Sequence, residues 1–549
     1  MPRILINEKD RTSPGTPGSY ANYSVLIPGF MNREPVLAVD ATKEKPADKI
    51  QPDSNGVYEF SSAQDFKDTI GLIDKKTVNG ADEYHYGNKM AYKLLDMGYT
   101  VIYKPIDFIL TQKDSEGEIT KLGLDHEDFW EDFKDKASYD FRFVSHGLLE
   151  SNLPDNKVAD YEGYVERLRI VKEDAAKFAE ITAEEYPNYI KDLAGVDADG
   201  NSKLICKEDG TLYFTDSAGL QYGTYAEAKA ELGKGIDGTI KAISDLEDAI
   251  ATCSGSYVTT GVINNINGII AKLASYRTDD KGVVFCGGRG DCTALIELDE
   301  KCYVKTSSTV RPENLIINGI KGLSSFIGAE GEYCALTAPS VHYYVDDTTT
   351  YKMPGAFHYL TCFMNSISSG FAEWYAAAGY TRGVSSYVID HTSVKLGEIA
   401  INALEPRRLV TNGPKFACNV IANFRGSYYL WGNRTAAQLT ENDLTAKHFL
   451  NIRQLCSTLK KQLYVACRRF TFDPNSDTLW FNFVNAITPT LDAMKADQGV
   501  RDYKILKVFT DKKATLKAKI RIIPIEAVED FDIEVSLEDS FGGVSVNAN

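Results

Sequence analysis

The sequence predicts a multidomain protein of mixed α/β and α+β class, and two observations lead to this prediction. The chain has 549 residues, whereas a single hydrophobic core stops growing at about 250–300 residues. Apolar residues recur at helical spacing in some stretches and alternate as in strands in others. We therefore expect a central α/β domain with an insertion, an α+β C-terminal domain and extended arms at both chain ends.

Changes in composition place the boundaries between these units. A short apolar strand with Ile4 and Ile6 precedes the breaker-rich stretch RTSPGTPGS, so this first segment cannot bury itself. The block at 107–257 is acidic and is predicted to be an insertion. The expected units are an N-terminal arm at 1–22, an N-terminal part of the body at 23–106, the acidic region at 107–257, a central α/β domain at 258–395, a C-terminal domain at 396–525 and a C-terminal arm strand at 526–549.

Periodicity and turn residues predict the individual elements. A helix followed directly by a strand, with glycine between them, favours an α/β unit. The predicted helices are Gln64–Asp74, Asn88–Met97 closed by Gly98, much of Ala159–Lys191, Thr224–Thr252 and Gly370–Ala378 closed by Gly379; the predicted strands are Thr100–Lys104, Tyr139–Val144 and a hairpin over Ser202–Thr215.

The composition excludes several classes of protein. A net charge of −17 argues against a general nucleic-acid binder. No apolar run approaches the ~20 residues of a membrane span, so we expect no direct membrane partner. The ten cysteines are scattered without zinc spacing and are expected to be reduced thiols. We expect neither a cofactor nor a metal.

One acidic stretch has calcium-loop spacing. Asp197, Asp199, Asn201 and Glu208 fall at positions 1, 3, 5 and 12 of an EF-hand loop. Ser202 stands where the sharp turn needs glycine, and a polar turn explains the same residues. The polar turn is the preferred interpretation.

Two apolar strands around a glycine turn are predicted at 281–298. Arg289, Gly290 and Asp291 within it spell a cell-adhesion tripeptide, but the chain lacks the secretory and disulfide context of an adhesin. The second segment is predicted to be a strand, so no helix N-terminus would face a phosphate beside these glycines.

A basic amphipathic helix is predicted over 448–470. Apolar residues recur there at steps of three and four, and all charged residues between Phe449 and Phe470 are basic. Such a face needs an acidic partner or solvent. These residues are our candidates for contact with another protein: Arg453, Lys460, Lys461, Arg468 and Arg469.

Four ordered motifs in this part of the chain carry a family resemblance. They are Asn423–Gly426, WGNRT at Trp431–Thr435, FLNIRQL at Phe449–Leu455 and FDPNSDTLW at Phe472–Trp480. In this order they resemble the C-terminal domain of contractile phage tail sheath proteins. The residues that form the fold motif are Trp431, Gly432, Arg434, Pro474 and Trp480.

The resemblance implies a fold and a function. The central domain would have subtilisin-like topology, and the protein would polymerise helically around a tail tube and contract to drive the tube through the host envelope. The implied partners are copies of itself, the tube protein and the baseplate and neck or terminator proteins. The implied location is the virion tail, with assembly in the host cytoplasm. The same fold also serves phage-tail-like bacteriocins and extracellular injection systems.

The chain end adds a pattern of charge. The segment Phe449–Arg521 has 14 Lys and Arg against 6 Asp and Glu, whereas 522–549 has 7 acids and no base. Apolar residues alternate with basic ones over 516–522 and with acidic ones in the last segment, as in two half-buried strands. The second strand either folds back on its own domain or, as the resemblance implies, crosses to a neighbour; its apolar positions are Phe531, Ile533, Val535 and Leu537.

A hydrolase is the alternative from another class. It would need a reactive serine or cysteine beside a histidine, and none of the seven histidines lies in a serine-protease signature. No G-x-S-x-G elbow is present, and no β-repeats of a tail spike are visible. We therefore expect a structural protein without catalytic residues.

Overall fold

The structure is a computed structural model of the whole chain, and the residues it describes fall in several ranges. They are 23–31, 50–151 without 79–80, 115 and 137, then 168–170, 172–173, 175–176, 180, 204–206, 212–215, 221–222, 225–252, 258–278, 291–304, 310–344, 349–442, 444–509, 516–525 and 527.

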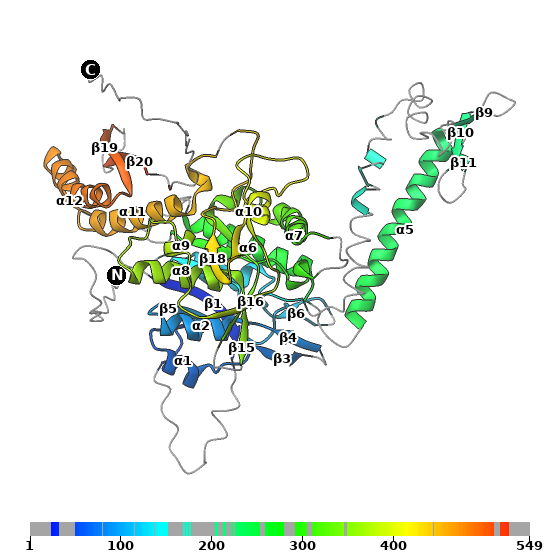
Figure 1. Cartoon of the computed structure of the whole chain (residues 1–549), viewed down its shortest axis with the longest axis horizontal. Helices are drawn as coiled ribbons and strands as arrows, with labels where there is room; N and C mark the ends of the chain where they lie inside the picture. Colours follow the sequence, from blue (N-terminus) through cyan, green and yellow to red (C-terminus); the bar gives the residue numbers. More distant parts are fainter. Residues whose placement is uncertain are drawn as a thin grey trace, which may run out of the picture.

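One eight-stranded sheet forms the centre of the body (Figure 1). Six parallel strands are flanked by one antiparallel strand at each edge. Helices cover both faces of a parallel sheet, so both faces of its strands carry mainly apolar side chains. The central strands of this sheet are buried and mainly apolar in this way. The strand order is β18 (Ser427–Trp431), β17 (Asn419–Phe424), β13 (Cys334–Ala338), β12 (Thr293–Ile296), β8 (Phe143–Ser145), β1 (Ser24–Phe30), β5 (Thr100–Ile106) and β2 (Tyr58–Phe60).

Helices cover both faces of this sheet, which confirms the predicted mixed α/β class. Successive residues of β1 point into different cores, Leu26 into one and Val25 and Ile27 into the other. The first core receives side chains from η1 (Glu127–Lys134), α6 (Thr260–Thr278), α7 (Pro312–Ile327) and α10 (Glu398–Leu404). The second receives them from α1 (Ala63–Thr69), α2 (Gly87–Asp96) and α8 (Gly355–Ser368).

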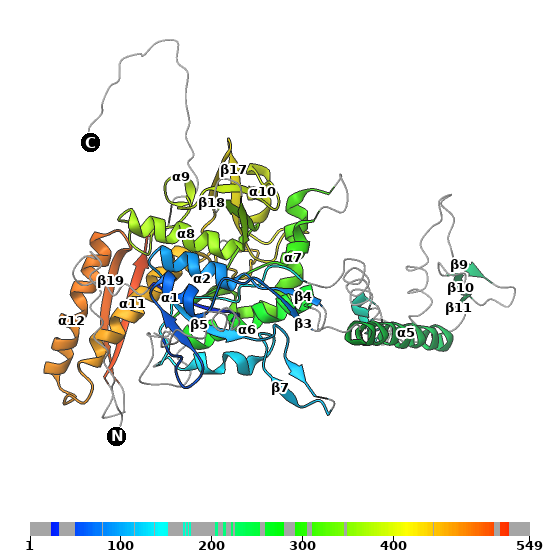
Figure 2. The same ribbon diagram turned by 90° about the horizontal axis from the view of Figure 1, so that it is seen from below.

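The sheet runs across the predicted domain boundaries. Strand β8 lies at its centre, although its residues belong to the predicted inserted region at 107–257. The part that stands away from the body starts later and includes α5 (Tyr225–Thr252), at whose far end lies a small sheet (Figures 1 and 2). That sheet consists of β9 (Leu204–Cys206), β10 (Leu212–Thr215) and β11 (Gln221–Tyr222), so the predicted hairpin is confirmed.

Helix α8 corrects one prediction. The expected helix Gly370–Ala378 is absent from those residues, and the helix lies at Gly355–Ser368 instead. Gly370 adopts φ of +90° directly after the C-cap of α8, so it ends a helix rather than beginning one. A single turn, α9 (Gly379–Arg382), follows.

The remaining elements of the body are short. A three-stranded sheet of β14, β15 and β16 packs beside α8, and the other elements connect the larger ones. They are β3 (Lys75–Val78), β4 (Ala81–Tyr84), β6 (Gln112–Lys113), β7 (Ile119–Lys121), η2 (Glu300–Tyr303), η3 (Gly328–Tyr333), β14 (Val341–Tyr344), β15 (Thr350–Met353), β16 (Ile389–Thr392) and η4 (Ala446–His448).

The C-terminal elements form a unit at the end of the body opposite α5 (Figure 2). Helices α11 (Leu450–Arg468) and α12 (Asp477–Ala496) pack against a ribbon of β19 (Val500–Val508) and β20 (Lys517–Pro524). The predicted basic helix and the predicted alternating strand near residue 520 are both present. Leu455 and Leu459 of α11 share a small core with Leu491 of α12.

Candidate functional site

The loop that leads into α11 contains the fold motif. Gly432 has φ of +142°, and a Cβ there would lie 2.8 Å from the Cα of Asn419, so this position requires glycine. The Asn419 Oδ1 atom accepts a hydrogen bond from the Arg434 backbone at 2.7 Å. The Arg434 guanidinium lies over the Phe449 ring at 4.8 Å and fixes the start of α11. The motif residues Trp431, Gly432 and Arg434 therefore hold this joint.

The other two motif residues, Pro474 and Trp480, lie beyond α11. Pro474 is exposed in the turn between α11 and α12. Trp480 is half-buried in the first turn of α12, whose N-cap Ser476 accepts a hydrogen bond from the Leu479 backbone. These residues shape the turn and the start of α12.

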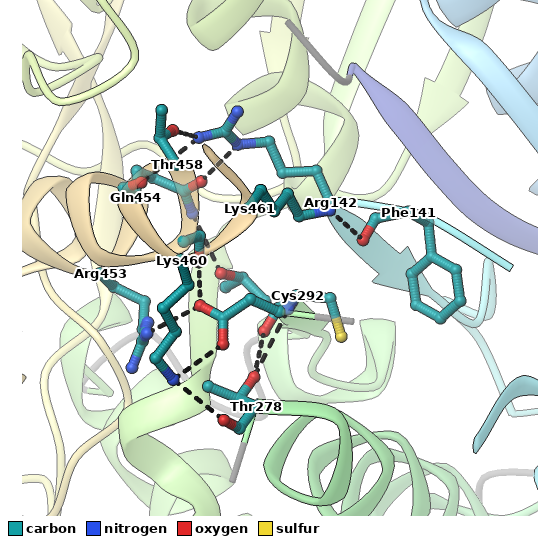
Figure 3. A network of polar contacts seen from close by, with 12 residues as sticks. Phe141, Arg142, Thr278, Cys292, Arg453, Gln454, Thr458, Lys460 and Lys461 are labelled. Atoms are coloured by element: carbon teal, nitrogen blue, oxygen red, sulfur yellow. Dashed lines mark hydrogen bonds and ion pairs between the residues drawn. The ribbon is translucent and has the colours of Figure 1, made fainter. Parts of the chain in front are cut away.

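A buried carboxylate anchors α11 to the sheet (Figure 3). Asp291 lies two residues before β12 and is 0% exposed. Its Oδ2 atom accepts hydrogen bonds from Arg453 Nη2 at 2.9 Å and Ser457 Oγ at 2.7 Å, and its Oδ1 atom accepts one from Lys460 Nζ at 3.2 Å. Burial alone would raise the pKa of Asp291, but the two cations offset this and hold the pKa below its usual value. Asp291 is therefore ionised at neutral pH.

A second group of contacts joins the same helix to β8 (Figure 3). The buried Arg142 donates to Gln454 Oε1 at 2.9 Å and also to Thr458. Lys461 donates to Asp140 Oδ1 at 2.7 Å and is only 2% exposed. Burial lowers the pKa of Lys461, although Asp140 favours its charged form.

This network lies at the amino ends of the sheet strands. Residues 140–142 precede β8 and 291–293 lead into β12, and both strands run parallel. In α/β enzymes the ligand site lies at the opposite, carboxyl edge of the sheet. The polar network around α11 therefore joins this helix to the sheet within one chain, and we call it the joint.

Three of the five interface candidates have acidic partners inside the same chain. Arg453 and Lys460 pair with Asp291, and Lys461 pairs with Asp140, so these contacts account for their charge without a neighbour. Arg468 and Arg469 lie exposed at the end of α11 and stay candidates for contact with another protein.

Asp291 was missed as the partner of this helix. In the sequence, Asp291 was considered only as the last residue of the Arg-Gly-Asp tripeptide. Its carboxylate is fully buried and cannot reach an adhesion receptor. The signal in the sequence that could have identified Asp291 as a buried partner is its place two residues before the apolar strand β12. Arg289 and Gly290 lie outside the described residues, as do the calcium candidates Asp197, Asp199, Asn201 and Glu208.

A Cys–His pair tests the hydrolase alternative. Cys362 Sγ lies 3.6 Å from His358 Nε2 on α8, and both residues are fully buried. Burial lowers the pKa of His358 to about 3 and raises that of the Cys362 thiol. A thiol that stays protonated and cannot be reached by substrate is no nucleophile. This pair is structural.

The ribbon of β19 and β20 has two different faces. Tyr503 and Ile505 of β19, with Ile520 and Ile522 of β20, pack on α11 and α12. The opposite face carries four basic residues and one acid, Asp502, and Lys504 lies directly across from Arg521. Within the described part of the chain, no acid forms an ion pair with the basic residues of this face, Lys504, Lys517, Lys519 and Arg521.

The predicted arms lie outside the described residues. This applies to Ile4 and Ile6 at one end and to Phe531, Ile533, Val535 and Leu537 at the other. Across the described ranges, no group of three or more His, Cys, Asp or Glu side chains is placed to hold a metal ion. None of the helices in those ranges has the length and apolar character to cross a membrane.

Comparison with known proteins gives two structural likenesses. A chain of the anti-feeding prophage baseplate aligns over 98% of this chain and 99% of its own, with a TM-score of 0.48 and 10% identity. A chain of the contracted PVC sheath complex, an extracellular contractile injection system, aligns over 50% of this chain and 68% of its own, with a TM-score of 0.36 and 15% identity. Neither a family model nor a curated protein sequence matches the chain.

Both TM-scores lie below 0.5 and both identities lie below 25%, so neither likeness establishes a role for this chain.

Proposed function

We propose that this protein is the structural subunit of a contractile tail sheath. Many copies would surround a tail tube as a helical polymer, whose contraction drives the tube through the host envelope. The observation that carries the proposal is the β19–β20 ribbon, because its strands pair only with each other within the described residues. A two-stranded ribbon has two free edges, and free edges accept further strands.

The acidic chain end has the pattern that such an edge requires. In β20, Ile520 and Ile522 face the helices, while Lys519 and Arg521 face outward. A strand added beside it must follow the same alternation. In the segment 531–538 the apolar residues alternate with Asp532, Glu534, Ser536 and Glu538, so its apolar side would continue the packed face and its acids would lie beside the basic face.

The donor of this strand is a second copy under the proposal, so that each subunit completes the ribbon of a neighbour. Arg468 and Arg469 are then candidates for contact with the tube or an adjacent copy. The baseplate and neck proteins would bind the ends of the polymer, and the virion tail would be its location after assembly in the host cytoplasm. A phage-tail-like bacteriocin or an extracellular injection system would use the same subunit chemistry. We further propose subtilisin-like topology for the central domain.

Deletion of Val528–Asn549 tests the proposal. The truncated chain should fold, because the described cores contain none of the deleted residues. The truncated chain should stay a single subunit in negative-stain electron microscopy, whereas the full chain should form tubes. Normal tubes from the truncated chain would rule out strand donation by the C-terminal segment.

Charge reversal in the same assay separates strand addition from other roles of the chain end. Lys519→Glu with Arg521→Glu places acids opposite the acidic strand and should abolish the tubes while leaving the subunit folded. The matched control is Lys67→Glu with Lys113→Glu, which changes the net charge equally at exposed positions on α1 and β6, outside the ribbon. Equal loss in both variants would mean that net charge, rather than the ribbon, governs assembly.

A further inference from the structure

A row of three basic residues crosses the small sheet at the carboxyl edge of the body. In this sheet β14 pairs with β15 on one side and β16 on the other. His342 of β14 lies directly opposite Lys352 and directly opposite His391. Residues directly opposite each other point to the same face of a sheet. Lys352, His342 and His391 therefore form one row, which we call the histidine row.

The two imidazoles of the row are in direct contact. Their ring centroids are 4.1 Å apart and the ring planes differ by 14°, so the rings are stacked. They line a cleft of about 450 Å³ between β14, β16 and η2. Two neutral rings stack favourably, whereas two imidazolium ions at this distance repel each other.

Charged groups surround the row on several sides. Asp390 Oδ2 lies 2.7 Å from His391 Nδ1. Glu150 forms an ion pair with Lys352, and Glu300 lies 3.3 Å from the Lys352 ammonium. Lys395 is the other cation that lines the cleft.

His342 is the ring that resists protonation. Burial, the His391 ring and the Lys352 ammonium together lower the pKa of His342 to about 4, although Asp390 and Glu150 act in the other direction. When a folded histidine has a pKa below the ordinary value of about 6.5, the fold loses stability as pH falls through the interval between the two values. The second proton on the row is thus the costly one.

We propose that the histidine row is an acid-labile joint: protonation of both rings separates β16 from β14 while the eight-stranded sheet stays folded. The bulge next to the pair supports this location, since the pairing shifts register between His342 and Tyr343 and the ladder is interrupted there. Separation would loosen the segment from β16 to α10 and open the cleft. The proposal does not depend on the sheath function.

Hydrogen exchange measured by mass spectrometry and corrected for intrinsic rates tests the joint. Between pH 7.5 and pH 4.5, opening of the peptides that contain Val341–Tyr344 and Ile389–Thr392 should rise roughly 50- to 100-fold. Opening of β13, Cys334–Ala338, should change far less in the same sample. An equal rise in β13 would show global acid unfolding through other buried groups and would overturn the proposal.

Two variants make the assignment specific. His342→Gln should remove most of the acid dependence of the β14 and β16 peptides, and His391→Gln should reduce it. In each variant one histidine remains, and it can be protonated without a second imidazolium beside it. His391 is half-exposed, so that variant stays informative if His342→Gln does not fold. His126→Gln removes an exposed histidine on η1 and is the matched control. An unchanged acid dependence in His391→Gln and His342→Gln would sink the proposal.

Discussion

Two sets of basic side chains in the C-terminal part of the chain differ in what surrounds them. Arg453, Lys460 and Lys461 of α11 meet Asp291 and Asp140 at the ends of sheet strands. The four outward cations of the β19–β20 ribbon meet no acid among the described residues, and two of them face each other. Both sets look alike in sequence, since each is a run of Lys and Arg between apolar residues.

The difference separates a joint from a binding surface. A charge removed from water needs an opposite charge and further hydrogen bonds, so the α11 set can exist only because its partners are already in place. The ribbon set stays hydrated and tolerates a missing partner, which leaves it available for another chain. Like charges opposite each other on a sheet are unfavourable, and a neighbouring acidic strand would relieve this.

The largest effect is expected at Asp291. Asp291→Asn leaves Arg453 and Lys460 without their carboxylate in a buried site, and we expect the free energy of unfolding to fall by about 3–5 kcal/mol. Urea denaturation measures this change. Asp473→Asn, at an exposed acid in the α11–α12 turn, is the control and should stay within about 0.5 kcal/mol of the parent. A loss below about 1 kcal/mol at Asp291 would contradict the distinction between joint and surface.

A smaller effect is expected at the other pair of the joint. Lys461→Met keeps the volume of the buried stem and removes a cation that burial already disfavours. Asp140 loses its contact with Lys461 but is 10% exposed, so water can reach it. We expect a loss of about 1–2 kcal/mol in the same assay. If Lys461→Met lowers the free energy of unfolding as much as Asp291→Asn does, the size of the loss does not depend on how deeply the remaining charged group is buried.

Much of the fold followed from local patterns. Helix α11, helix α5, the hairpin β9–β10 and strand β20 appear where periodicity placed them, because each shows its own side-chain period within one segment. The position of β8 at the centre of the sheet did not follow, since its three residues show no period and its pairing is set by strands far away in sequence. Helix α8 was missed because it is buried on nearly all sides, so polar residues such as His358 and Thr361 do not mark an exposed face.

The joint was only half visible in the sequence. The basic stripe of α11 was visible as a helical spacing, but the choice between solvent, another protein and the same chain depends on tertiary contacts. Asp291 lies 162 residues before Arg453, and no local rule joins them. The like-charge pair of Lys504 and Arg521 likewise required the strand register, which alternation alone does not supply.

The smallest effect is expected on the ribbon. Lys504→Gln removes one member of the like-charge pair, so we expect the subunit to gain roughly 0.2–1 kcal/mol in unfolding free energy at low salt. Lys517→Gln is matched, since it removes the same charge from the same face but lies opposite Val508, and it should change stability less. At about 1 M salt the Debye length is roughly 3 Å, so the difference between the two variants should disappear. A gain of equal size in both variants at low salt would assign the effect to net charge rather than to the pair. Because only an exposed pair is screened in this way, the salt dependence distinguishes the ribbon from the joint, where Asp291→Asn should be costly at every salt concentration.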